Sequence, residues 1–275
     1  MNRMQNLWKI WLMAWLLTVS SSQLTAQTPV LPQGHAHNDY EHERPLLEAL
    51  SHGFISVEAD VYLIEDTLRV AHDRPADPPR APTLEETYLQ PLRERIEANQ
   101  GRVYPDWSGP FYLMIDIKTE AEPTYQAIRQ ALLPYRDILV VGTPNGWRPG
   151  PVQVFLSGNR PIPAVMADTL RLAGLDGRPA DLGKGYPASV MPVVSDHYRR
   201  HLYWSGDGDV PADQREKLTA LARQVHDEGK KLRLWASPER RTVWAFLLDH
   251  GADLINTDSL QAFQDFMIHR RRSND

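Results

Sequence analysis

Two carboxylates one residue apart interrupt an otherwise apolar run. Glu58 and Asp60 lie within residues 54–63, which read Phe-Ile-Ser-Val-Glu-Ala-Asp-Val-Tyr-Leu. In a β-strand, side chains at positions i and i+2 point to the same face, so both carboxylates would project together. Placing two like charges side by side in a protein interior is costly unless a cation offsets them. The pair therefore predicts a site for a hard metal ion.

Further groups of polar side chains follow other apolar segments. They are Gly34-His35-Ala36-His37-Asn38-Asp39-Tyr40, His72-Asp73, Asp116-Ile117-Lys118-Thr119, and Trp235 together with Asn256-Thr257-Asp258. Parallel (β/α)8 barrels assemble their active sites at the carboxyl ends of the strands. We therefore expect these groups to converge on one site.

The elements that must position these groups alternate along the chain. Strand-like segments cover residues 30–34, 54–63, 68–71, 111–117, 138–142, 152–157, 164–167, 189–194, 232–236 and 254–256. Helix-like patterns cover residues 45–51, 84–97, 123–133, 213–228 and 240–250, with Ser237 and Pro238 expected to start the last helix. Alternation of this kind is typical of a parallel sheet with crossover helices. We predict an α/β fold, a single (β/α)8 TIM barrel over residues 27–275, irregular in its middle units, where glycine and proline are frequent between residues 142 and 187.

Residues 1–26 have the pattern of a signal peptide. Arg3 and Lys9 precede a short apolar stretch at residues 10–19, and Leu24-Thr25-Ala26 resembles a cleavage site. We expect export to the periplasm or secretion after cleavage, with an uncleaved N-terminal anchor as the alternative. The chain has no cysteine, so neither a disulfide nor a thiolate metal site is available. We expect no stable membrane insertion of the mature chain, residues 27–275.

The net charge argues against a nucleic-acid partner. It is −5 for the whole chain and −7 without residues 1–26, which contain two basic residues and no acidic one. The basic run at residues 269–272 is interpreted as a solvated helix end. No protein partner is implied, and the expected partner is a small-molecule or lipid substrate.

Taken together, the motifs resemble the superfamily of glycerophosphodiester phosphodiesterases and phosphatidylinositol-specific phospholipases C. The resemblance rests on Gly34-His35 with Asn38, Glu58-x-Asp60, His72-Asp73, Asp116-x-Lys118, Trp235 and Thr257-Asp258, in this order. Two departures concern the substrate. Residues 35–40 replace the His-Arg-Gly of the common glycerophosphodiesterases, and Asp116 replaces a glutamate. Asn38 and Asp116 are closer to the sphingomyelinase D branch, and His-x-His-Asn-Asp-Tyr resembles a branch that includes a fungal mitochondrial-inheritance protein.

The chemistry of these residue types fits phosphodiester cleavage. Glu58, Asp60 and Asp116 offer hard oxygen ligands, which favour one divalent cation, Mg²⁺ first and Ca²⁺ as the alternative. His35 and His72 are the expected acid–base pair, because histidine exchanges protons near neutral pH.

The remaining candidates would bind the substrate. Lys118, Asn38 and Trp235 are expected at the phosphate or the pocket wall, and His37 either touches the substrate or packs behind it. The resemblance implies a glycerophosphodiester or (lyso)phospholipid-type substrate. It also implies attack by a neighbouring substrate hydroxyl, through a cyclic phosphate.

Two other functions compete with this one. His35-x-His37 also resembles the first metal-binding motif of zinc amidohydrolases, for which His197 and Asp258 are the later ligand candidates. A barrel that binds its ligand without turnover is the second alternative.

Overall fold

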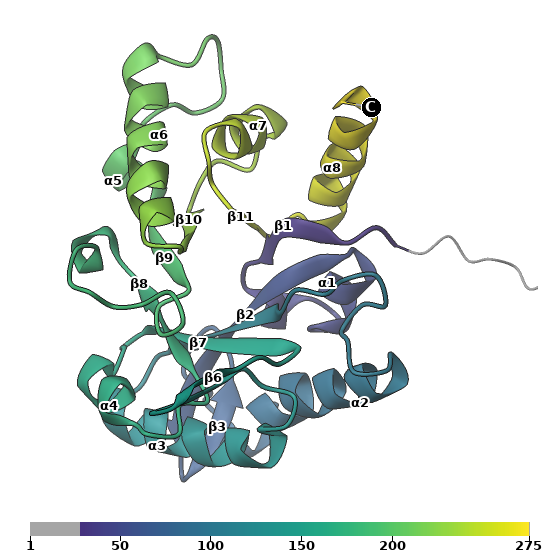
Figure 1. Ribbon diagram of the computed structural model, residues 1–275. Coiled ribbons are helices and arrows are strands. Elements are labelled where there is room, and N and C mark those ends of the chain that lie inside the picture. The colour runs from purple at the N-terminus through teal and green to yellow at the C-terminus, as the bar shows by residue number, and fades with distance from the viewer. Residues whose placement is uncertain (1–27, 275) are drawn as a thin grey trace, which may run out of the picture.

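Parallel strands close into a barrel in residues 28–274, the part of the chain that the computed structural model describes (Figure 1). The predicted signal peptide, residues 1–26, lies outside the described residues. The barrel strands are, in spatial order, β1 (Leu31–Ala36), β2 (Phe54–Ile64), β4 (Phe111–Ile117), β7 (Val152–Gly158), β8 (Gly174–Gly177), β9 (Val193–His197), β10 (Lys231–Trp235) and β11 (Leu254–Thr257). The barrel closes because β1 pairs with both β2 and β11. The predicted TIM barrel is therefore confirmed.

The strands are buried on both faces, as expected when helices cover a parallel sheet. In β4 only Asp116 is not fully buried, because it lies at the mouth of the barrel. The covering helices are α1 (Leu47–Ser51), α2 (Gln90–Ala98) preceded by the π-helical turn η3 (Glu85–Leu89), α3 (Ala121–Leu132), α4 (Ile162–Ala167), α5 (Tyr198–His201), α6 (Ala212–Asp227), α7 (Arg241–Asp249) and α8 (Leu260–Asn274). Short 3-10 turns lie at η1 (Asp39–Glu41), η2 (Pro78–Arg80), η4 (Leu133–Tyr135) and η5 (Pro179–Asp181).

A hairpin extends the sheet beyond the closed barrel. β3 (Thr67–Val70) runs antiparallel to the end of β2, and Glu65 and Asp66 form the turn with positive φ angles. The hairpin returns the chain to the mouth of the barrel, which places His72 beside the end of β2. A small second sheet, β5 (Val141–Thr143) with β6 (Gly146–Arg148), lies before β7.

The structure corrects the sequence prediction in the middle of the chain. Residues 164–167 are not a strand but part of α4, which has a proline in its first turn. The strand that fills this place is β8, whose sequence Gly-Leu-Asp-Gly resembles a loop. Its glycines permit close packing, since a Cβ on Gly174 would lie 2.6 Å from the carbonyl oxygen of Val190.

The C-terminal helix packs against the first strand (Figure 1). Near its end, Arg271 Nη2 donates to the carbonyl oxygen of Val30 at 2.6 Å, so this basic segment is docked on the barrel rather than fully solvated. The helix α7 starts at Arg241, later than Ser237 and Pro238 predict. Within residues 28–274, no helix is both long and apolar enough to cross a membrane.

Candidate active site

A pocket of about 490 Å³ opens at the carboxyl ends of the strands. Seven of the eight site residues predicted from the sequence line it: Asn38, Glu58, Asp60, His72, Asp116, Lys118 and Trp235. The eighth, His35, lies below it. Residues that the sequence analysis left out or left undecided also line the pocket: His37, Ser157, Asn159, Arg178 and Arg233.

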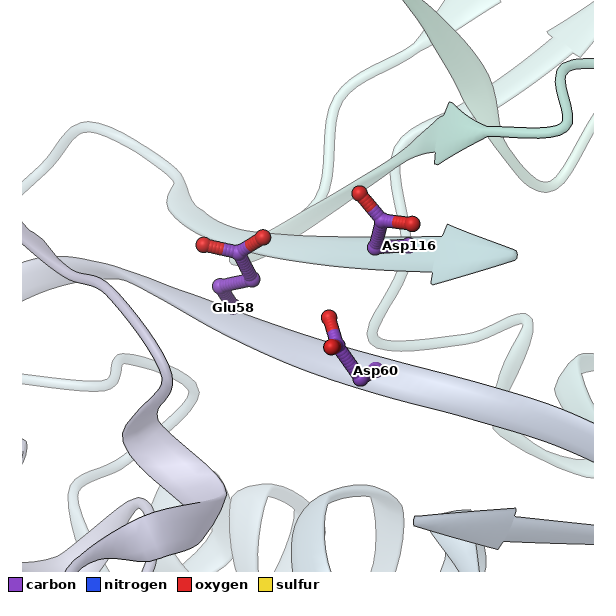
Figure 2. A group of neighbouring side chains, drawn as sticks. All are labelled: Glu58, Asp60 and Asp116. Atoms are coloured by element: carbon purple, nitrogen blue, oxygen red, sulfur yellow. The ribbon is translucent and has the colours of Figure 1, made fainter. Parts of the chain in front are cut away.

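Three carboxylates form one cluster in this pocket (Figure 2). Glu58 and Asp60 face the same way from β2, and Asp116 lies beside Asp60 on the neighbouring strand β4. One oxygen from each of the three lies within 4.8 Å of the others. Glu58 Oε2 and Asp60 Oδ1 are buried and have no hydrogen-bond partner among the described residues. Buried oxygens without a partner, in an all-carboxylate donor set, fit a hard divalent cation.

The protonation of the three carboxyl groups depends on their different neighbours. Burial raises the pKa of Glu58, but the nitrogen-bearing side chains around it outweigh burial and bring the pKa down to about 2. Burial and the charge of Glu58 raise the pKa of Asp60 to about 6. Burial also raises the pKa of Asp116. A bound dication would lower the pKa of both aspartates, because it stabilises their charged form.

Lys118 bridges two members of the cluster. Its Nζ lies 3.0 Å from Asp60 Oδ2 and 3.1 Å from Asp116 Oδ1, while its backbone N–H donates to the carbonyl oxygen of Val61. The ammonium group therefore lies beside the proposed cation site and remains partly exposed to the pocket.

His72 is tied to the cluster through a tyrosine. Tyr40 Oη lies 3.0 Å from His72 Nδ1, 2.8 Å from Asp60 Oδ2 and 2.8 Å from Asn38 Oδ1. A hydroxyl donates a single proton, and carboxylates are the stronger acceptors. Donation to Asp60 leaves the tyrosine oxygen to accept from His72 Nδ1–H. That tautomer leaves His72 Nε2 unprotonated and free to accept a proton.

His35 does not reach the pocket. It is 0% exposed, with Nδ1 2.7 Å from Ser56 Oγ and Nε2 2.7 Å from Arg233 Nη1. A guanidinium can only donate, so His35 Nε2 must accept and Nδ1 must carry the proton. Burial first, and then Arg233, lower the pKa of His35 to about 4. The expected role of His35 in acid–base exchange therefore does not match its position, because the ring is fully buried and Ser56 and Arg233 engage both of its nitrogens.

His37 occupies the place expected of His35. It lines the pocket, with Nδ1 2.7 Å from Asp258 Oδ1 and Nε2 3.8 Å from Glu58 Oε2. Burial lowers the pKa of His37, but the hydrogen bond to Asp258 and the charge of Glu58 outweigh it, so the pKa lies above its ordinary value. His37 is therefore poised to hold a proton at the pocket surface.

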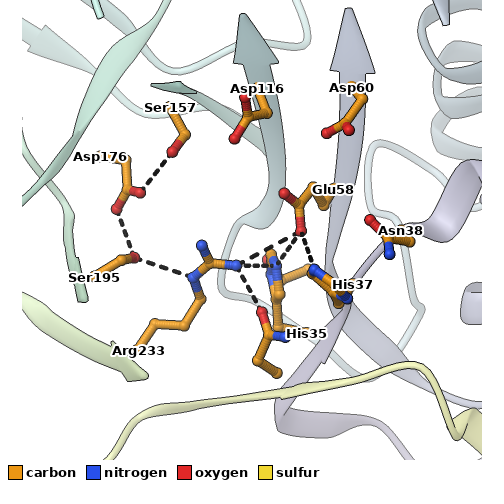
Figure 3. A network of polar contacts seen from close by, with 12 residues as sticks. His35, His37, Asn38, Glu58, Asp60, Asp116, Ser157, Asp176, Ser195 and Arg233 are labelled. Carbon is orange, nitrogen blue, oxygen red and sulfur yellow. Dashed lines mark hydrogen bonds and ion pairs between the residues drawn. The ribbon is translucent and has the colours of Figure 1, made fainter. Parts of the chain in front are cut away.

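A chain of polar contacts crosses the barrel below the pocket (Figure 3). Arg233 Nε donates to Ser195 Oγ at 3.0 Å, Ser195 Oγ donates to Asp176 Oδ1 at 2.6 Å, and Ser157 Oγ donates to Asp176 Oδ2 at 2.9 Å. Arg233 Nη1 also donates to Asn256 Oδ1 at 2.8 Å. The sequence did carry a signal for Arg233, which stands inside the buried strand Lys-Leu-Arg-Leu-Trp.

The zinc alternative does not fit this geometry. The guanidinium of Arg233 occupies the ring nitrogen of His35 that a metal would need. His197 accepts from the backbone N–H of Arg199 and packs edge-on against Trp235. Among the described residues, the group able to hold a metal is the carboxylate cluster.

Comparisons with known proteins identify related chains and a shared fold. A family model described as an AIM6-like phosphodiesterase domain matches residues 25–173, which include Glu58, Asp60 and Asp116. The altered inheritance of mitochondria protein 6 homolog of Arthroderma benhamiae is 29% identical over 267 residues, covering 84% of this chain and 82% of its own length. The altered inheritance of mitochondria protein 6 of Eremothecium gossypii is 30% identical over 285 residues. The match covers 89% of this chain and 72% of that protein's own length.

A solved structure shares the fold. The glycerophosphodiester phosphodiesterase from Parabacteroides distasonis aligns with a TM-score of 0.50 and 16% identity, covering 90% of this chain and 99% of its own.

Proposed function

This chain belongs to the AIM6-like phosphodiesterase family, and we propose that it cleaves a glycerophosphodiester or (lyso)phospholipid-type diester with the help of one divalent cation. The observation that carries the proposal is the buried carboxylate cluster with its unpartnered oxygens, flanked by two imidazoles at the mouth of the barrel.

Glu58, Asp60 and Asp116 would hold the cation, Mg²⁺ first and Ca²⁺ as the alternative. When bound, it would draw charge from a phosphodiester oxygen and so stabilise the transition state. Lys118 and Arg233 would bind the remaining phosphate oxygens, because both cationic groups line the same pocket. Asn38 would contribute a hydrogen bond, and Trp235 would form the wall.

His72 would act as the general base and His37 as the general acid. His72 Nε2 takes the proton of a substrate hydroxyl next to the phosphate as that oxygen attacks phosphorus. The bond from phosphorus to the leaving oxygen breaks, and His37 gives its proton to that oxygen. The products are a cyclic phosphate and an alcohol, and water can open the ring in a second step. His35, behind the pocket, positions Arg233 and the floor of the site.

The test is turnover of bis(p-nitrophenyl) phosphate and of a panel of glycerophosphodiesters and lysophospholipids. We expect activity with Mg²⁺, its loss with EDTA, and its loss in Glu58→Gln. Phosphorus NMR of the products shows whether a cyclic phosphate is released. Activity that survives EDTA would overturn the proposed mechanism, and metal binding without any turnover would support the barrel that only binds.

We also propose that the mature protein is exported and begins at Gln27. The basic start, the short apolar stretch and the small residues before position 27 support this. N-terminal sequencing of the protein from culture fluid or periplasm tests it, and recovery of intact residues 1–26 at a membrane would favour the anchor.

A further inference from the structure

The proposed reaction leaves one arginine of the pocket without a task. Arg178 follows β8 directly, lines the pocket and has a side chain that is 26% exposed. Together with Ser157 of β7, it forms one wall of the pocket. Because β7 and β8 follow β4 around the barrel, Asp116 on β4 lies between this wall and the two carboxylates of β2 (Figure 3).

Buried groups fix the guanidinium of Arg178 in place. Its Nη1 donates to Asp176 Oδ2 at 2.7 Å and to the carbonyl oxygen of Gly177 at 2.8 Å, and its Nη2 donates to Ser157 Oγ at 3.2 Å. Asp176 is 0% exposed and also accepts from two serines, so it is fully used by the protein. The backbone N–H of Arg178 donates to Asp181 Oδ2 at 3.0 Å, which holds the base of the side chain as well.

Part of the guanidinium remains free to bind a ligand. Arginine has five N–H donors, and the contacts above use Nη1 and one proton of Nη2. Nε–H and the second Nη2–H have no acceptor among the described residues. These two neighbouring donors form an edge that matches a carboxylate or phosphate in a bidentate manner.

The charge of the pocket favours the same kind of ligand. The carboxylates that line it are those of the cluster, which the cation would occupy. Lys118, Arg178 and Arg233 line it as well. A positively charged ammonium headgroup would meet no free carboxylate on this wall, whereas an anion would meet a fixed donor.

We propose that the wall formed by Ser157 and Arg178 is a subsite for an anionic group, phosphate or carboxylate, carried by the alcohol part of the diester. This proposal rests on the proposed function and names the substrate class of the same pocket. Diesters whose headgroup carries an additional anion are the preferred substrates, ahead of those with a choline headgroup.

A matched substrate pair tests the preference. Glycerophosphoinositol 4-phosphate and glycerophosphoinositol differ only in one phosphate group, and glycerophosphocholine adds a cationic headgroup. We expect kcat/KM to be at least about tenfold higher for the 4-phosphate than for the parent diester, as for one charge-assisted bidentate contact. Glycerophosphoserine, whose headgroup carries a carboxylate, tests whether the subsite also takes a carboxylate in place of a phosphate. Equal values for the 4-phosphate and the parent diester would overturn the proposal.

Arg178→Gln should abolish the preference, so that within this variant kcat/KM is equal for the 4-phosphate and for glycerophosphoinositol. The ratio of the two values is the readout, because the change also removes the ion pair with buried Asp176 and that loss acts on both substrates alike. Arg178→Lys, which keeps the charge without the bidentate edge, should retain a part of the preference. Arg80→Gln is the matched control, because it removes the same charge from an exposed turn outside the pocket. A preference that survives in Arg178→Gln with unchanged thermal unfolding would contradict the assignment.

A binding measurement separates this proposal from the proposed function. Calorimetry with inositol 4-phosphate and with inositol needs no turnover, and we expect only the former to bind and Arg178→Gln to lose it. Binding of inositol 4-phosphate without cleavage of any diester would contradict the proposed function and support the anion subsite. Cleavage of diesters without binding of inositol 4-phosphate, and without a preference for the 4-phosphate diester, would support the function and contradict the subsite.

Discussion

His35 and His37 differ by two residues and face the same side of the chain, yet they occupy opposite chemical environments. His35 is enclosed and accepts from a guanidinium, whereas His37 lies at the pocket surface against a carboxylate. Sequence spacing places both side chains on the same face, because the strand period is two. It could not predict where the floor of the pocket lies between them, since that depends on Arg233 from a strand nearly two hundred residues away.

Alanine variants should separate the two histidines. We expect His37→Ala to lower kcat by about 10²–10⁴-fold with little change in thermal unfolding, because it removes a proton donor. His35→Ala should instead lower the unfolding free energy by about 2–4 kcal/mol, because it leaves Arg233 short of an acceptor in the core. Steady-state kinetics and calorimetry of both variants check this, and a stable His35→Ala with full loss of turnover would restore the role predicted from the sequence.

Tyr40 links His72, the proposed base, to the carboxylate cluster through one oxygen. Tyr40→Phe keeps the ring and removes that oxygen, so His72 is no longer held in one tautomer. We expect kcat to fall by about 10–100-fold at nearly constant KM, as for loss of an orienting hydrogen bond. Tyr62→Phe, which removes a hydroxyl bonded to the backbone oxygen of His72, is the control and should change kcat by less than about threefold. Equal losses in both variants would argue against an orienting role.

Asp39 should make stability depend on pH. Burial raises its pKa to about 7, against hydrogen bonds from the backbone of Leu46 and from Tyr88. The folded state therefore keeps a proton that the unfolded chain releases near its ordinary pKa of 3.8, and stability falls as pH rises from about 4 to about 7.

Asp39→Asn should remove this pH-dependent loss of stability. Between pH 5 and pH 8, the unfolding free energy of the variant should therefore rise by about 1–4 kcal/mol relative to that of the native protein. Urea unfolding at a series of pH values measures the difference. Asp106→Asn, on the exposed surface, should give no such trend. A constant difference between Asp39→Asn and the native protein across this range would show that Asp39 is charged throughout.

At the scale of elements, strands with strong apolar runs were predictable and the short strand β8 was not. Phe111–Ile117 matches its predicted limits because its seven residues are nearly all apolar. Gly174–Gly177 forms a strand for a packing reason, since only a residue without a side chain fits against Val190 there. Local propensity reads such a segment as a loop, and the tertiary contact that overrides it is not visible in the sequence.

Gly174→Ala tests this explanation. The added Cβ would lie 2.6 Å from a backbone oxygen, so the backbone of β8 must shift. We expect a loss of about 2–3 kcal/mol in unfolding free energy, as for an overpacked core. Gly208→Ala is the comparison, because a Cβ there meets open space and only the positive φ costs about 1 kcal/mol. Similar losses in the two variants would contradict the packing argument.

At the scale of the whole molecule, the site is a ring of residues at the carboxyl ends of the strands. Many of them come in pairs spaced two apart, so that both side chains point into the barrel. Examples are Glu58 with Asp60 on β2, Asp116 on β4 with Lys118 just after it, and Asp176 on β8 with Arg178 just after it. The first two pairs were singled out from the sequence, but Asp176 and Arg178 were not. Ser157 and Ser195 were not singled out either, because a lone serine within an apolar strand is common and gains meaning only from its partners across the barrel.

Cation binding should stabilise the entire barrel, because the carboxylate cluster joins two of its strands. At a free Mg²⁺ concentration one hundred times its Kd, we expect the native protein to gain about 2.7 kcal/mol. Thermal unfolding with and without EDTA measures this independently of turnover. Glu58→Gln should lose the effect, and an unchanged melting temperature in the native protein would argue against the ion.

The closure of β1 onto β11 determines when the pocket comes into being during biosynthesis. Its floor joins His35, near the start of the fold, to Asn256 and Arg233, near the end. A nascent polypeptide on the ribosome therefore cannot complete this pocket until β11 has emerged. We expect partly made chains that lack β11 to be inactive.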